Sequence, residues 1–353
     1  MTYMPSKCLR VGQKPKASVL ILVLIVLASM VTLSAGLAYR TRIEMQLAHA
    51  YAQRTESYYL ALGGIERVKA LLSHEKLSPL TIAHLCRFHG TAKEEDLFEE
   101  LEGLTDGKLV AYSLRDEQGY LNINKSDPGS WTNMDLGSKE LCSSIVDWTD
   151  ADDDTEPDGA ETDFYQRLEP AHVAKNSPCA ALRELILVRG VTQNIYTGED
   201  LNRNSSLDEN ERDGQLQFPG DNEDNELDLG IVDIFTVHGD GRININTAPY
   251  HILSVLQGLD EEAADIILAY RAGPDGQFGT DDDTCFTSAE ELAHVEGLTE
   301  LQIELLPQYC CFDSEYFRIF SAASLDKTLR CCLMATAKST ENGIQILCFE
   351  RLL

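Results

Sequence analysis

The sequence predicts an α+β fold in which a long N-terminal helix packs on a small antiparallel sheet, and a large, mostly α-helical insertion interrupts that sheet. Three observations support this prediction. A proline-free run from residue 18 to about 72 begins with uncharged residues and continues with apolar residues at helical spacing. β-rich segments lie at 108–124 and 316–351. The long stretch between them is dominated by short helix signals and acidic loops.

The N-terminal run "ASVLILVLIVLASMVTLSAGLAY", residues 17–39, carries no charge. A bilayer is crossed by about 20 such residues, so the run predicts a transmembrane helix. Four basic residues and no acid precede it, whereas all 58 acidic residues follow it. The positive-inside rule therefore predicts a single pass with residues 1–17 as a cytoplasmic leader and the bulk of the chain on the far side. A cleaved signal peptide is the alternative, but its apolar core is normally about 7–15 residues long.

The helix is expected to continue beyond the membrane, and the first predicted domain covers residues 18–75. Its second half presents one apolar stripe, made of Tyr58, Leu62, Ile65, Val68 and Leu72. The pair Gly63-Gly64 indicates a bend or a close contact.

The remaining chain is predicted to divide into three parts. Residues 76–125 form the first part of the sheet domain, residues 126–312 the inserted helical domain, and residues 313–353 the strands that complete the sheet. Within the insertion, "GRININTAP" reads as a strand followed by a helix start. We expect Asn246 or Thr247 to cap that helix and Pro249 to occupy its first turn.

Two segments of the insertion, residues 251–271 and 287–306, have the pattern helix, glycine-containing hairpin, helix. In DNA-binding versions the hairpin and the following helix N-terminus bind phosphate, but here those ends carry acidic residues. The net charge of −29 also argues against nucleic acid. We therefore interpret both segments as packing units. The sequence contains no recognisable catalytic constellation, so it favours a protein that is not an enzyme.

An acidic loop at residues 200–211, "DLNRNSSLDENE", fits the twelve-residue calcium-loop template. The alternate positions of such a curled loop point inward and supply oxygen ligands to Ca²⁺. The predicted ligands are Asp200, Asn202, Asn204, the backbone carbonyl of Ser206, Asp208 and Glu211. One departure is Ser205, which stands where the template usually has glycine.

A second acidic block, "DWTDADDDTEPDGAETDFY" at residues 147–165, predicts a weaker cation site. So many carboxylates repel one another unless a cation or solvent separates them. The candidate ligands are Asp150, Asp152, Asp154 and Glu161. A third block, residues 274–283, is interpreted as an acidic turn.

Several of these segments together resemble the K-type minor pseudopilin of the type II (general) secretion pathway. The resemblance rests on the N-terminal helix, "SIVDWTDADDDTEPDGAETDFY", "ALRELILVRGVTQNIY" and "GRININTAPYHILSVL". It implies a pilin-like fold with a calcium-binding helical insertion, anchored in the bacterial inner membrane with its bulk in the periplasm. It further implies a role in capping or initiating the pseudopilus, together with I- and J-type pseudopilins and the inner-membrane secretion machinery.

The resemblance also implies processing by a prepilin peptidase. Cleavage between Ala17 and Ser18 places the cut directly before the apolar run, whereas cleavage after Gly12 would leave charged residues at the start of the membrane helix. Most pilins have glutamate five residues into the mature chain, and this count reaches Leu22. K-type members lack that glutamate as well.

Two other classes of protein remain open at this stage. One is a membrane-anchored helix-hairpin-helix protein of a DNA-uptake or type IV pilus-like system, which should bind DNA in a salt-dependent way. The other is an anchored periplasmic hydrolase that uses calcium structurally.

Overall fold

The structure is a computed structural model that describes residues 17–74, 78–86, 99–100, 108–131, 139–199, 229–325, 328–341 and 343–351. The chain divides into two compact units, Met1–Glu56 and Ser57–Leu353. Helix α1 (Ala17–His74) contributes to both, which agrees with the single long helix that the sequence predicts.

In the first unit, α1 carries apolar side chains that are exposed along its whole membrane-length run. Val19, Leu20 and Leu22 are each more than half exposed. Among the described residues, α1 holds the one segment that is long and apolar enough to cross a membrane. By its length and composition, this helix is a candidate membrane anchor.

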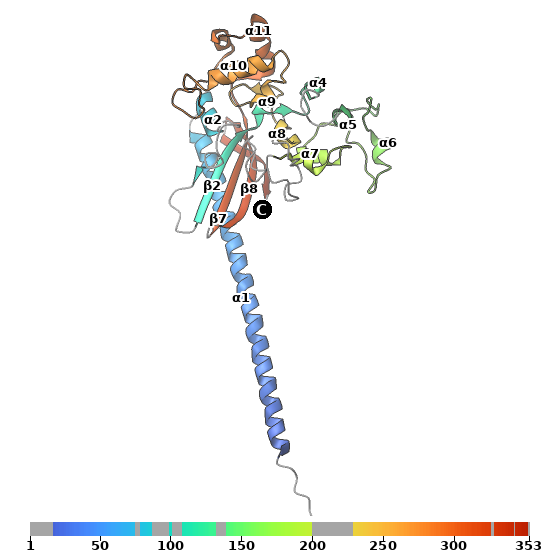
Figure 1. Cartoon of the computed structure of the whole chain (residues 1–353), viewed down its shortest axis with the longest axis vertical. Helices are drawn as coiled ribbons and strands as arrows, with labels where there is room; N and C mark the ends of the chain where they lie inside the picture. Colours follow the sequence, from blue (N-terminus) through green and yellow to red (C-terminus); the bar gives the residue numbers. More distant parts are fainter. Residues whose placement is uncertain are drawn as a thin grey trace, which may run out of the picture. The chain divides into compact units, whose positions relative to one another are not determined.

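The second unit is built on a five-stranded antiparallel sheet with the order β1-β2-β7-β8-β9 (Figure 1). Its strands are β1 (Glu99–Glu100), β2 (Lys108–Asp116), β7 (Tyr316–Leu325), β8 (Thr328–Thr340) and β9 (Gly343–Arg351). Buried and half-buried residues alternate along β7, as expected of a strand with one face in a core. The last three strands are neighbours in sequence and form successive hairpins.

The C-terminal part of α1 supplies the other side of this core. Its residues Ala61, Ile65 and Val68 belong to one buried cluster with apolar side chains of β2, β7 and β8. Gly64 marks a close contact: a Cβ at this position would lie 2.2 Å from the Ser321 Oγ atom of β7. Helix α2 (Pro79–Leu85) adds Ile82 to the same cluster.

The insertion leaves the sheet at the end of β2 and returns at the start of β7. Asp116 and Phe317 are direct partners in the β2–β7 ladder, so the two ends of the insertion lie side by side. Glu117 and Arg318, 201 positions apart in sequence, form a buried ion pair at this junction, with Arg318 Nη2 donating to Glu117 Oε2 over 3.0 Å.

The insertion consists of short helices around one large apolar cluster that includes Trp131, Ile145 and Phe235. Its described elements, in chain order, are η1 (Glu117–Gly119), β3 (Leu121–Asn122), α4 (Pro128–Trp131), α5 (Lys139–Thr149), α6 (Thr162–Tyr165), η2 (Leu182–Leu187), α7 (Gln193–Thr197), α8 (Ile231–Ile234), β4 (Phe235–Thr236), β5 (Ile243–Asn244), α9 (Tyr250–Leu253), α10 (Glu261–Arg271), η3 (Ala289–His294), α11 (Glu300–Tyr309) and β6 (Cys310–Cys311). The helix-rich character agrees with the prediction from sequence.

The two helix-hairpin-helix segments pack on each other reciprocally. The hairpin residue Gly258 has a positive φ of 89° and lies against Leu305 of α11, while Gly297, with φ of 104°, lies against Ile266 of α10. Each hairpin therefore needs glycine both for its backbone conformation and for its contact with the other segment. This arrangement agrees with their interpretation as packing units.

The prediction that Asn246 or Thr247 caps the next helix is wrong. Helix α9 has Pro249 as its N-cap and no capping side chain. The Asn246 amide instead donates to the carbonyl of Phe286 over 2.8 Å and accepts from the Phe286 N–H over 2.7 Å. Thr247 donates its hydroxyl to Asp116 Oδ2. Both side chains thus join distant segments, because buried polar groups require partners wherever the fold provides them.

Candidate metal centre

Three carboxylates meet at the C-terminal end of α5. The helix turns an apolar face into the core through Leu141, Ile145 and Trp148, which orients Asp147 in its last turn. Asp150 follows directly after the helix. Glu161 is the N-cap residue of α6, where its side chain accepts a hydrogen bond from the Thr162 N–H.

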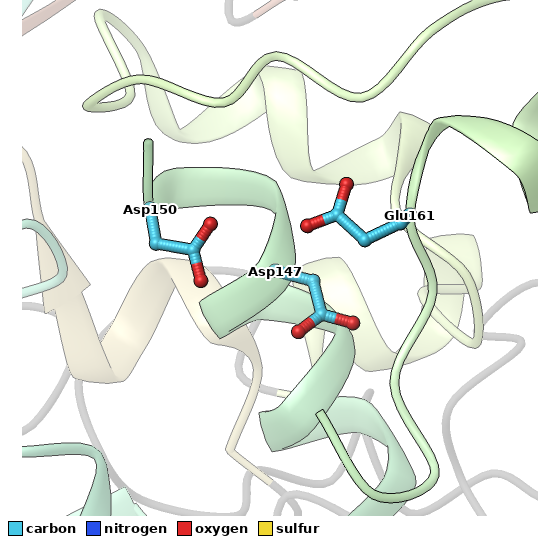
Figure 2. A group of neighbouring side chains, drawn as sticks. All are labelled: Asp147, Asp150 and Glu161. Atoms are coloured by element: carbon cyan, nitrogen blue, oxygen red, sulfur yellow. The ribbon is translucent and has the colours of Figure 1, made fainter. Parts of the chain in front are cut away.

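One oxygen of each carboxylate lies within 4.8 Å of an oxygen of the other two. Figure 2 shows the carboxylate groups of Asp147, Asp150 and Glu161 turned toward a common space. Asp147 is fully buried and Glu161 is only 3% exposed. One oxygen of each group, namely Asp147 Oδ2, Asp150 Oδ1 and Glu161 Oε1, is buried without a hydrogen-bond partner.

The loop between Asp150 and Glu161 is fitted closely to this cluster. Asp147 Oδ1 accepts from the Glu156 N–H over 3.0 Å, which fixes one oxygen and leaves the other for a ligand. Asp158 adopts a left-handed conformation with φ of 70° in the turn that follows. At Gly159, a Cβ would lie 2.1 Å from Asp147 Oδ2, so any side chain there would displace the carboxylate.

The surroundings disfavour the charged form of all three groups. Burial, followed by the charges of neighbouring acids, raises the pKa of Asp147 and of Asp150 above the ordinary aspartate range. Burial and the nearby negative charges raise the pKa of Glu161 to about 7. Buried carboxylates that share a site repel one another, and a bound cation removes that repulsion.

These residues fit a hard divalent cation. Unpartnered buried polar atoms are rare in folded proteins, and three converging carboxylate oxygens are the ligands that Ca²⁺ and Mg²⁺ prefer. Ca²⁺ accepts six to eight oxygen ligands in flexible geometry, including backbone carbonyls, so a loop of this kind suits it better than Mg²⁺, which keeps a regular octahedron with several waters.

The sequence-predicted ligands fall into three groups. Asp150 and Glu161 lie in the cluster, whereas Asp152 and Asp154 lie outside it: Asp152 Oδ1 accepts from the Asp154 N–H in an exposed turn. Asp147 was not predicted, although its place three residues before Asp150 near a helix end was a usable signal. The predicted calcium loop, residues 200–211, lies outside the described residues. Of the predicted cleavage pair, Ala17 is the first residue of α1 and Ser18 follows within it.

Comparison with known proteins identifies the segment around this cluster. Residues 132–198 match the family model of type II secretion system (T2SS), protein K. The matched residues include all three carboxylates.

Curated relatives agree with that match. The type II secretion system protein K of Klebsiella pneumoniae is 25% identical over 52% of this chain. A protein of Escherichia coli (strain K12) named "Putative type II secretion system protein K" is 32% identical over 26% of this chain. The chain spans 61% and 35% of these two relatives. A chain in the solved GspK-GspI-GspJ complex of enterotoxigenic Escherichia coli aligns at 15% identity with a TM-score of 0.48, over 88% of this chain and 99% of that chain.

Proposed function

We propose that this chain, which carries a protein K domain of the type II secretion system, acts as a minor pseudopilin that caps or initiates a periplasmic pseudopilus. The match of residues 132–198 to the protein K family is the observation on which the proposal rests. A membrane-length apolar helix and a sheet packed on its continuation are the further features that a pilin-like subunit requires.

In this proposal the chain is not an enzyme, and calcium is a structural ion. The buried oxygens of Asp147, Asp150 and Glu161 support the binding of a divalent cation. Their mutual repulsion would destabilise the loop at residues 150–161 without a cation. A cation bound there would stabilise the inserted domain by linkage, since it binds the folded state only. The loop at residues 200–211 remains a candidate for a second calcium ion.

The proposed orientation places the N-terminus in the cytoplasm, as the four basic residues before the span suggest. A prepilin peptidase would cut between Ala17 and Ser18. The mature chain would then assemble with I- and J-type pseudopilins and the inner-membrane secretion machinery.

Two features favour an end position over a place in the shaft of the fibre. Leu22 stands where most pilins have a glutamate, so the chain lacks one charged contact that a membrane helix can make with a neighbouring subunit. The insertion between β2 and β7 also adds bulk that a closely spaced helical lattice would have difficulty accommodating. A repeating subunit must accept a neighbour on both sides, whereas a terminal one need not.

The decisive experiment is deletion of the gene and complementation with the full chain, combined with native mass spectrometry of the detergent-extracted complex. We expect loss of protein secretion on deletion, Ser18 as the mature N-terminus and one copy per assembly with I- and J-type partners. Many copies along a filament would exclude the cap, and unchanged secretion after deletion would exclude the role in secretion.

A further inference from the structure

Residues 150–161 are hereafter called the cation loop. A groove of about 540 Å³ separates the sheet from the segment that follows this loop. One wall is the sheet face that carries Phe320, Met334 and Leu347. The opposite wall is residues 180–187, hereafter the groove wall, which presents Ala181, Arg183 and Ile186 to the groove. The groove wall is mainly the short 3₁₀ helix η2, whose N-cap Ala181 makes no side-chain cap hydrogen bond. Such helices have poorer hydrogen-bond geometry than α-helices, and long runs of them are uncommon.

The N-terminal end of the groove wall is tied to the cation loop through Asn176. Its side-chain amide donates to the carbonyl of Asp152 over 2.6 Å and to Asp153 Oδ1 over 2.9 Å. Asn176 holds a left-handed φ of 46°, a conformation that costs about 1–2 kcal/mol for most residues and is tolerated by asparagine. The neighbouring Lys175 extends this tie by an ion pair of 2.5 Å with Glu184 of η2.

The C-terminal end of the groove wall is tied to the same loop through Arg189. Its guanidinium donates to the carbonyl of Gly159 over 2.9 Å and to that of Asp158 over 3.4 Å. The guanidinium also lies over the Phe164 ring, 5.1 Å from its centroid. Gly159 is the residue that touches Asp147 Oδ2, so this tie reaches directly to the carboxylate cluster.

We propose that a cation held by Asp147, Asp150 and Glu161 fixes the groove wall, and thereby the shape of the groove, through the two ties made by Asn176 and Arg189. The inference rests on the cation site of the proposed function. The cation holds the loop at residues 150–161, the loop presents the carbonyls of Asp152 and Gly159, and these carbonyls fix the two ends of the groove wall. Leu182 and Leu185 belong to the buried cluster of the insertion and keep the segment attached to it, so the cation controls the order of the wall and not its attachment.

Hydrogen–deuterium exchange of the full chain in detergent micelles tests this coupling, with calcium or chelator as the only difference. At a hundredfold excess over its Kd, calcium can slow exchange in its own loop by up to about 100-fold. If the contacts of Asn176 and Arg189 transmit this effect, exchange at residues 182–187 should slow by about tenfold. Local opening of the groove wall would have to break those contacts. Residues 261–271 of α10, which are remote from the ties, should be unchanged.

The double variant Asn176→Gly/Arg189→Gln removes both ties while letting the backbone keep its positive φ at position 176. We expect calcium still to protect residues 147–161 in this variant, and no longer to protect residues 182–187. The control Arg167→Gln makes the same arginine change at an exposed position outside the groove wall, and it should retain the protection of both segments. Calcium binding to each chain is measured separately by isothermal titration calorimetry.

The outcomes are distinguishable. If the unmodified chain binds no calcium, the structural ion of the proposed function is wrong, and this inference is wrong with it. If calcium binds and protects residues 147–161 but leaves residues 182–187 unchanged, or protects both segments equally in the double variant, the cation site stands and the coupling is refuted.

Discussion

Replacing Asp147 by Asn should change the stability of the chain in opposite directions with and without calcium. The amide keeps the size of the carboxylate and an oxygen for the hydrogen bond from the Glu156 N–H. It removes one negative charge from a group whose oxygens lie within 4.8 Å of one another. In chelator the substitution therefore removes repulsion, and in calcium it removes a ligand.

The magnitudes follow from the distances. At 4.8 Å and an effective dielectric constant of about 20, two carboxylates repel by about 3 kcal/mol. Partial protonation relieves some of this, so we expect the variant to be about 1–3 kcal/mol more stable than the parent chain in chelator. This site should stabilise the parent chain by about 2.7 kcal/mol at a hundredfold excess of calcium over its Kd, and the variant should lose most of that contribution.

Urea unfolding followed by tryptophan fluorescence measures both quantities, because Trp148 lies next to Asp147 in α5. Asp265→Asn, an exposed aspartate on α10, is the matched control and should leave the calcium-dependent gain intact. A variant that is less stable than the parent in chelator, or that gains as much from calcium, would refute the assignment of Asp147 as a cation ligand.

Three further predictions concern the rest of the chain. Gly64→Ala should destabilise the packing of α1 on the sheet by about 1–3 kcal/mol, because its Cβ would lie 2.2 Å from Ser321 Oγ. In thermal unfolding, this loss of stability should be smaller in a Ser321→Gly background. An equal loss in both backgrounds would contradict the contact. Burial lowers the pKa of His251 to about 4, so the folded state prefers the neutral ring and stability should fall by up to about 3 kcal/mol as the pH drops from 6.5 to 4. His251→Gln should lose this pH dependence of stability. A variant whose pH profile is identical to the parent's would contradict the prediction. The helix-hairpin-helix segments should bind no duplex or single-stranded DNA in gel shifts at low salt, since their helix starts carry Asp260 and Glu300; micromolar, salt-sensitive binding would favour the DNA-uptake alternative.

The elements of this fold that sequence periodicity describes were predictable. The C-terminal part of helix α1 and strand β7 each bury one regular face, so their apolar spacing carries the information directly. The role of Asn246 was not predictable, because its partners Phe286 and Phe312 are distant in sequence and become neighbours only after the insertion has folded.

The candidate metal centre was predictable in part for a similar reason. Asp150 and Glu161 belong to an acidic block that composition alone singles out. Asp147 is the first residue of that block, but it belongs to an amphipathic helix, where a single aspartate normally faces solvent. Asp147 is buried because Gly159 lies against its carboxylate. Gly159 belongs to the turn that follows the helix, so the pattern of the helix alone does not predict this contact.

The pairing of Asp116 with Phe317 has a consequence for the order in which the chain folds. Strands β7, β8 and β9 join through short turns, so that meander forms from local contacts. Strand β2 can dock on β7 only after a loop of about 200 residues has closed, and closing a flexible loop of that length costs about 5 kcal/mol in chain entropy by its length dependence alone. A folded insertion, with Glu117 and Arg318 already side by side, removes most of that barrier. The long-range half of the sheet should therefore form late, after the insertion has brought its own two ends together.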